Sequence, residues 1–106
     1  MDATDDLPAL ERRQPLEPAR VRTADVLVDI LVEHGVDVVF GLPGGAIAPL
    51  HDALLDRPEV RVVTTRHESG AMFAAAAYAR TTGKLGVVLV TSGPGVINAM
   101  TGLASA

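Results

Sequence analysis

The chain has 106 residues, a net charge of −4, no cysteine, and only 3% aromatic residues within a hydrophobic fraction of 48%. This length and composition predict one small domain with a thin aliphatic core. The acidic balance, without clustered lysine or arginine, argues against nucleic-acid and anionic-membrane surfaces as partners. The lack of cysteine excludes a disulfide scaffold and a thiolate metal site, and it is compatible with a reducing cytoplasm.

The first segment, residues 1–21, is expected to be a disordered leader, because it holds prolines among alternating charges and no apolar stretch. It has no signal-peptide pattern, and we expect a cytoplasmic protein. Residues 22–106 are expected to form the ordered part. The uncharged run at residues 85–106 is long enough to imitate a membrane span, but Gly93, Pro94 and Gly95 interrupt it, so no membrane span is predicted.

The ordered part should begin with a helix that has Thr23 as its N-cap and Gly35 as its stop. One face of this helix carries its larger apolar side chains, namely Val26, Leu27, Ile30 and Leu31. The continuous apolar run at residues 36–40 then predicts a short buried strand.

Two more strand–loop–helix units are expected after the helix at residues 46–56. Strands are predicted at residues 60–65 and 86–91; an alanine-rich helix opened by His67 and Glu68 closes near Gly83, and a last helix follows residue 95. This alternation predicts an α/β fold, an open parallel sheet with flanking helices. Three strands make an incomplete sheet, so we expect the chain to be part of a larger domain.

The carboxyl ends of the three predicted strands deliver the segments GLPGG (41–45), TTRHE (64–68) and TSGPG (91–95) to one edge, where open α/β sheets bind ligands. No charged residue occurs at 38–50 or after residue 84, so Glu68 is the only acid at that edge. Neither glycine-rich loop has a P-loop lysine. The dinucleotide pattern is matched only in its first half, because Asn98 stands where the third glycine belongs.

Glu68 could serve either of two roles. A glutamate in a first turn commonly just complements the helix dipole. If it is buried beneath apolar loops, however, it could exchange a proton with a ring nitrogen of a flat, neutral ligand. By the same reasoning His67 is expected at the surface and Arg66 in a salt bridge, while His34 and His51 lack metal-ligand spacing, so no metal site is predicted.

The segments VFGLPGGAIAPLHDAL and RHESGAMFAAAAYARTTGKLGVVLVTSGPGVINAMTGLASA resemble the N-terminal, pyrimidine-binding domain of thiamine-diphosphate-dependent enzymes. The closest likeness is to the large subunit of acetolactate synthase (acetohydroxyacid synthase), over residues 22–106. Two departures are Leu42, where synthases often have an aromatic residue, and Val96-Ile97, which replace a commoner small pair.

The resemblance implies that Glu68 is the catalytic acid that contacts N1′ of the aminopyrimidine of thiamine diphosphate. It promotes the imino tautomer, which deprotonates C2 of the thiazolium ring. The resulting ylide attacks a 2-oxo acid, with pyruvate as the expected substrate, and decarboxylation leaves an enamine that adds to a second 2-oxo acid. The resemblance also implies the residues that line the cofactor site, which are Pro43, Gly44, Gly45, Glu68, Thr91, Pro94, Gly95 and Asn98.

The same resemblance implies Mg²⁺ and diphosphate ligands in a domain absent from this sequence, and it leaves open whether FAD is bound. It places the site between the chains of a homodimer or higher homo-oligomer, with the alanine-rich helix at a subunit contact. Three alternatives remain: another member of the same family (a 2-oxo-acid decarboxylase, an oxidase or another carboligase), a truncated and inactive product, and a dinucleotide-binding half-domain.

Overall fold

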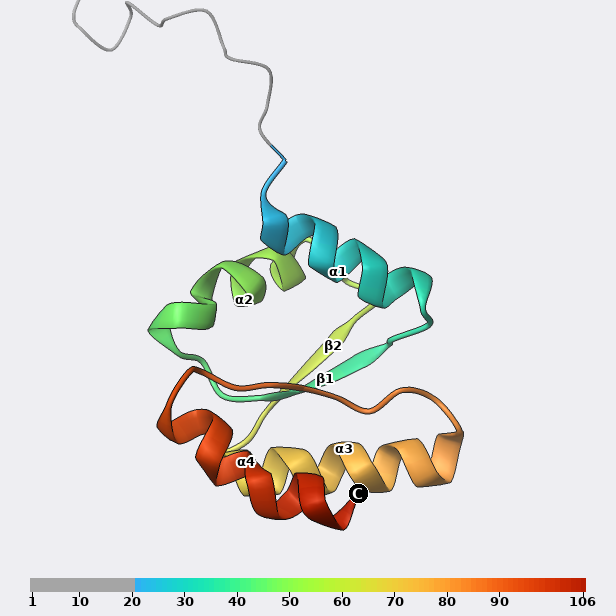
Figure 1. Ribbon diagram of the computed structural model, residues 1–106. Coiled ribbons are helices and arrows are strands. Elements are labelled where there is room, and N and C mark those ends of the chain that lie inside the picture. Colours follow the sequence, from blue (N-terminus) through green and yellow to red (C-terminus); the bar gives the residue numbers. More distant parts are fainter. Residues whose placement is uncertain (1–20) are drawn as a thin grey trace, which may run out of the picture.

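The computed structural model describes residues 21–106, and the predicted leader at residues 1–20 lies outside the described part. The chain forms alternating helices and strands (Figure 1), as the sequence predicts. In order, the elements are α1 (Thr23–Glu33), β1 (Val38–Gly41), a 3₁₀ turn η1 (Gly45–Ile47), α2 (Ala48–Leu55), β2 (Arg61–Thr64), α3 (Glu68–Thr82), β3 (Val87–Leu89) and α4 (Pro94–Ser105).

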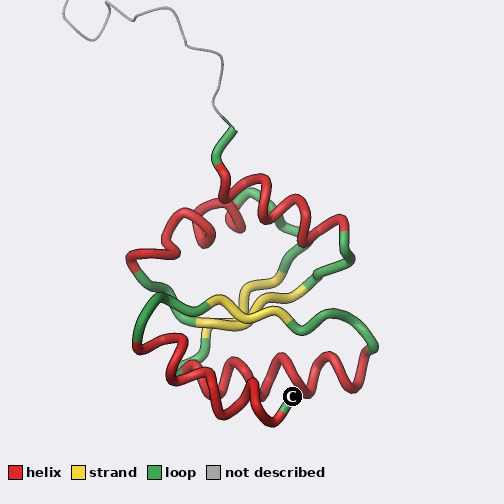
Figure 2. Tube along the Cα trace, in the orientation of Figure 1, coloured by secondary structure: helices red, strands yellow, loops and turns green. Residues whose placement is uncertain are grey.

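The three strands form one parallel sheet in the order β2-β1-β3. Val39 in the central strand lies opposite Val62 on one side and Val87 on the other. Helices α1 and α2 cover one face of the sheet, and α3 and α4 cover the other (Figure 2). The prediction of an open parallel sheet with helices on both faces is therefore confirmed.

The core lies between the sheet and the α1–α2 layer. Its buried members are aliphatic, namely Ala24, Val28, Val36, Val39, Ala53, Leu54 and Val60. No polar side chain is buried among the described residues. The core is thus small and built without aromatic residues, as the composition predicts.

Of the predicted apolar face of α1, only Leu31 packs against the core. Val26, Leu27 and Ile30 are 43–46% exposed, whereas Ala24 and Val28 are buried. The stripe of α1 that packs against the core consists of Ala24, Val28, Leu31 and Val32. The predicted cap is also wrong: Arg22 is the N-cap, and Thr23 is the first helical residue.

The strands are shorter than the sequence predicts, because only part of each apolar run pairs with a neighbour. β1 is largely buried, as expected for the central strand. β2 is mostly exposed, because it lies at the edge of the sheet.

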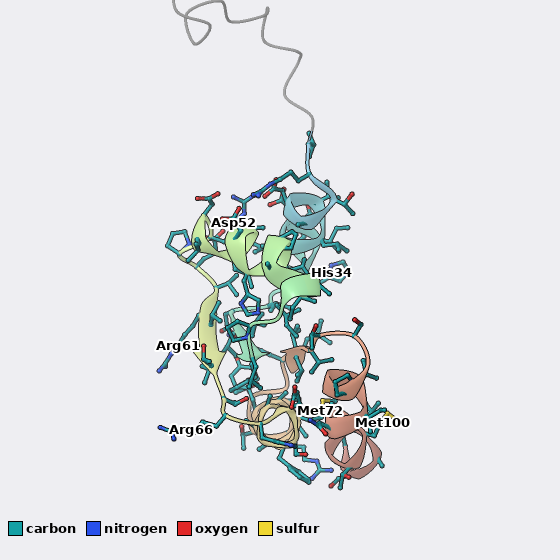
Figure 3. All side chains as sticks on the ribbon, turned by 90° about the vertical axis from the view of Figure 1, so that its left-hand side faces the viewer. His34, Asp52, Arg61, Arg66, Met72 and Met100 are labelled. Atoms are coloured by element: carbon teal, nitrogen blue, oxygen red, sulfur yellow. The ribbon has the colours of Figure 1, made fainter. Side chains whose placement is uncertain are left out.

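Helix α3 begins and ends close to the predicted residues. His67 caps its first turn, and Gly83, with a φ of 72°, ends it in the left-handed conformation. The close packing expected from its alanines occurs against α4 of the same chain, where a Cβ built on Gly102 would lie 2.6 Å from Cβ of Met72. Met72 lies between the two helices, while Met100 points outward from α4 (Figure 3).

Candidate functional site

β1 and β3 lie side by side, and the chain diverges beyond their carboxyl ends. The chain leaves β1 toward α2 on one face of the sheet, and it leaves β3 toward α4 on the other face (Figure 1). In open α/β sheets this divergence is where ligands bind. The two loops touch at Gly44 and Thr91, because a Cβ built on Gly44 would lie only 2.6 Å from Cβ of Thr91. Only glycine fits there without moving a loop.

Glu68 is the first residue of α3 and is half-buried at this edge. Its Oε2 accepts a hydrogen bond from Nδ2 of Asn98 at 3.1 Å. Its Oε1 lies beside Gly95, where a Cβ would come within 3.4 Å of that oxygen. The start of α3 and the first turns of α4 therefore meet at the carboxylate.

A local hydrogen-bond network fixes the first turn of α3. The backbone N–H of Ser69 donates to Nδ1 of His67 at 3.1 Å, and the hydroxyl of Thr65 donates to the carbonyl of His67 at 3.0 Å. The hydroxyl of Ser69 donates to the backbone carbonyl of Asn98 at 2.7 Å. Ser69 was not among the predicted site residues. Its place next to Glu68 was the only signal in the sequence, because its partner lies on another helix.

The pKa of the Glu68 carboxyl is lowered from its ordinary value. The main cause is the hydrogen bond from its own backbone N–H, followed by the hydrogen bond from the Asn98 amide, and the field of His67 acts in the same direction. Partial burial opposes these effects without overcoming them. The side chain is therefore an ionised carboxylate at neutral pH, able to accept a hydrogen bond.

The structure brings five of the eight predicted cofactor-site residues into one continuous group. Gly44 contacts Thr91, whose Cγ2 would lie 3.0 Å from a Cβ on Gly95, and Gly95 in turn adjoins Glu68, which is bonded to Asn98. The other three, Pro43, Gly45 and Pro94, lie exposed on the same loops.

The predicted salt bridge of Arg66 is not found between residues 21 and 106. Its side chain points away from the body of the molecule instead (Figure 3). His67 is exposed, as predicted. In the same part of the chain, no group of three or more His, Cys, Asp or Glu side chains could hold a metal ion.

One hollow of the described surface, of about 210 Å³, adjoins this edge at Val90 and Val96, but only apolar residues line it. Another, of about 360 Å³, lies beside β2 and is lined by Asp37, Val38, Phe40, Arg61, Val63 and Tyr78. It is wide open and lies toward the amino ends of the strands, where no glycine-rich loop leads into a helix. We therefore place the candidate site at Glu68, on grounds of chemistry and topology.

Comparison with known proteins identifies the class to which this fold and site belong. The sequence model of the family described as "Thiamine pyrophosphate enzyme, N-terminal TPP binding domain" matches residues 21–106. The chain therefore belongs to the thiamine pyrophosphate enzyme family.

Similar individual proteins are named acetolactate synthase. The acetolactate synthase of Mycobacterium avium is 46% identical over 99 residues, which are 93% of this chain and 16% of that protein. Acetolactate synthase 2, chloroplastic, of Brassica napus is 52% identical over 83 residues, or 78% of this chain and 13% of that protein. The acetolactate synthase large subunit of Lactococcus lactis is 47% identical over 83 residues, or 78% of this chain and 14% of that protein.

The chain thus spans only 13–16% of the length of these relatives. Among the described helices, none combines the length and the apolar character needed to cross a membrane.

Proposed function

We propose that this chain carries the cofactor-activating part of the site of a thiamine-diphosphate-dependent 2-oxo-acid carboligase of the acetolactate synthase type. The observation that supports it most directly is the state of Glu68. It is an ionised, half-buried carboxylate at the ligand-binding edge, with one oxygen held by Asn98 and the other beside bare glycine backbone.

The residues fit an aminopyrimidine ring. The loops after β1 and β3 carry no charge, so they suit a flat and largely neutral group. Gly44 and Gly95 let the backbone approach such a group closely. Glu68 would exchange a proton with a ring nitrogen and would accept a hydrogen bond from that nitrogen once it is protonated. Pro43, Gly45, Thr91 and Pro94 would surround the ring, while Asn98 holds the carboxylate.

When bound, thiamine diphosphate supplies an electron sink for the carbanion left by decarboxylation of a 2-oxo acid such as pyruvate. Glu68 contributes by holding a proton at the pyrimidine nitrogen, which is general acid–base chemistry.

Other functions of the site belong to parts of the enzyme beyond residues 21–106. We assign the diphosphate, its Mg²⁺ and any FAD to those parts, because residues 21–106 offer no metal cluster and the glycine-rich loops after β1 and β3 carry no basic side chain. We also propose that the site lies between the subunits of a homo-oligomer. Helix α4 leaves large apolar side chains exposed, namely Val96, Ile97, Met100 and Leu103, and a second subunit would cover them.

The test is Glu68→Gln in the complete native polypeptide that carries these residues. Turnover of pyruvate should fall by about 10²–10⁴-fold, the usual range for loss of acid–base catalysis. Glu59→Gln, which alters an exposed acid between α2 and β2, is the matched control and should leave turnover unchanged. Unchanged exchange of the thiazolium C2 proton in the Glu68→Gln variant would refute the role of Glu68.

The product of the same reaction tests the substrate class. Acetolactate is expected, whereas acetaldehyde would indicate a decarboxylase and acetyl phosphate an oxidase. A polypeptide that binds no thiamine diphosphate and turns over no 2-oxo acid would indicate an inactive product.

A further inference from the structure

We propose that Asn98 is a positioning residue for the Glu68 carboxylate: its amide holds one carboxylate oxygen so that the other is presented to the ring nitrogen of the ligand. This inference rests on the proposed function, because it takes Glu68 as the group that meets the ligand. It assigns Asn98 to the carboxylate instead of to direct contact with the cofactor.

The chemistry of the contact fixes which way the amide points. Nδ2 of Asn98 lies 3.1 Å from Oε2 of Glu68. The opposite orientation would place Oδ1 of Asn98 against an ionised oxygen, so that two acceptors would face each other. The N–H must therefore point at Glu68, and a hydrogen bond to a charged acceptor is among the stronger ones in proteins.

A second contact holds Asn98 in place. Its backbone carbonyl accepts a hydrogen bond from the Ser69 hydroxyl at 2.7 Å, so that two successive residues of α3 bind the same residue of α4. The helices can come this close because Gly95 and Gly102 present no side chain to α3. A short amide side chain on a fixed backbone has little freedom, so it restrains the carboxylate.

Among residues 21–106, Asn98 is the one side chain that donates a hydrogen bond to Glu68. On its own element, the neighbouring titratable group is His67, which influences Glu68 through its field. Helix α4 and the loops after β1 and β3 contain no charged residue. Without Asn98, the carboxylate would keep the hydrogen bond from its own backbone N–H but lose its only side-chain donor among residues 21–106, and Oε2 would be free to rotate.

The experiment compares Asn98→Ala and the isosteric Asn98→Asp with Thr101→Ala, an exposed position on the same helix, in the complete native polypeptide. The first readout needs no cofactor: the Glu68 carboxyl is titrated by NMR of ¹³C-glutamate-labelled protein, with the signal assigned by its loss in Glu68→Gln. Its pKa should rise in Asn98→Ala, rise further in Asn98→Asp because of the added like charge, and stay unchanged in Thr101→Ala.

The second readout is kinetic. Asn98→Ala should lower kcat by about tenfold to a hundredfold, the equivalent of one hydrogen bond to a charged group. The acidic limb of the pH profile should move to higher pH, because the carboxylate must be ionised. Added to Glu68→Gln, the same change should cost no more than about twofold, since the interaction is already lost.

The outcomes separate this inference from the proposed function. An active Glu68→Gln variant would overturn the proposed function itself. An inactive Glu68→Gln variant, combined with unchanged titration of Glu68 in Asn98→Ala and a weaker Kd for thiamine diphosphate, would overturn only the role of Asn98 and make it a cofactor contact.

A measurement on the unmodified protein covers the case in which the Asn98 variants do not fold. The Nδ2 protons of Asn98 should shift with the titration of Glu68, with the same midpoint. Their invariance across that titration would overturn the inference.

Discussion

Replacing Gly44 with alanine tests the contact between the loop that follows β1 and the loop that follows β3. Gly44 has extended backbone, with φ −158° and ψ 150°, so alanine meets no conformational strain there. The added Cβ would instead lie 2.6 Å from Cβ and 2.9 Å from Oγ1 of Thr91. Because ordinary carbon contacts are about 3.5–4.0 Å, one loop must move by roughly 1 Å. Overpacking of this kind costs about 1–3 kcal/mol of unfolding free energy.

Gly45 offers a matched control one residue further on. A Cβ built there meets no atom within 4 Å, so Gly45→Ala should change stability by no more than about 0.5 kcal/mol. Urea unfolding at neutral pH, followed by circular dichroism, measures both variants in the complete native polypeptide. In the Gly44→Ala background, Thr91→Ser should give no rescue because serine keeps the Cβ, whereas Thr91→Gly should relieve the clash.

The reasoning would be refuted if Gly44→Ala and Gly45→Ala had the same midpoint of urea unfolding. If Gly44→Ala and Gly45→Ala unfold at the same urea concentration with the same slope, the loops after β1 and β3 are not in contact. The close approach of Gly44 to Thr91 would then be refuted. A Gly44→Ala variant that is destabilised and rescued by Thr91→Gly supports the contact.

Three further predictions follow from the helices and the amino-terminal edge of the sheet. His67→Ala should lower the unfolding free energy by about 1 kcal/mol, whereas His67→Asn should retain it by supplying another N-cap acceptor. Gly102→Ala should cost about 1–3 kcal/mol through its contact with Met72, although alanine favours helix, while Gly70→Ala, which has open space, should stabilise α3. The pKa of Asp37 is lowered, chiefly by a hydrogen bond from Lys84 and secondly by one from Tyr78. Ionised Asp37 therefore stabilises the fold above the ordinary aspartate pKa, and this stabilisation is lost as the pH falls through the pKa of Asp37 in the folded protein. Asp37→Asn should therefore show a shallower loss of stability in acid.

Urea unfolding checks each of these predictions, the last one as a series of pH values. Equal stability of His67→Ala and His67→Asn would contradict the cap. A stabilising Gly102→Ala would mean that α3 and α4 are farther apart than described. An Asp37→Asn variant with the acid sensitivity of the parent would show that other carboxylates govern it.

Much of the site could be predicted because its residues follow strands directly. The turn from β2 into α3 carries Glu68, and the glycine-rich turns carry Gly44 and Gly95. Parallel strands bring their carboxyl ends to one edge, so order along the chain was enough to group these residues. The inner face of α1 could not be predicted in this way, because the choice between Leu27 and Val28 depends on how α2 packs.

The sequence by itself determined the alternation of helices and strands, the absence of charge from two loops, and the presence of one acid at the ligand-binding edge. These properties are local, since they depend on apolar periodicity, on glycine and proline, and on residue order. Only the tertiary structure decided that two successive residues of α3, Glu68 and Ser69, both bind Asn98 of α4. Those outcomes depend on how closely α3 and α4 approach, and hydrogen bonds between side chains 30 residues apart form only when packing sets that distance.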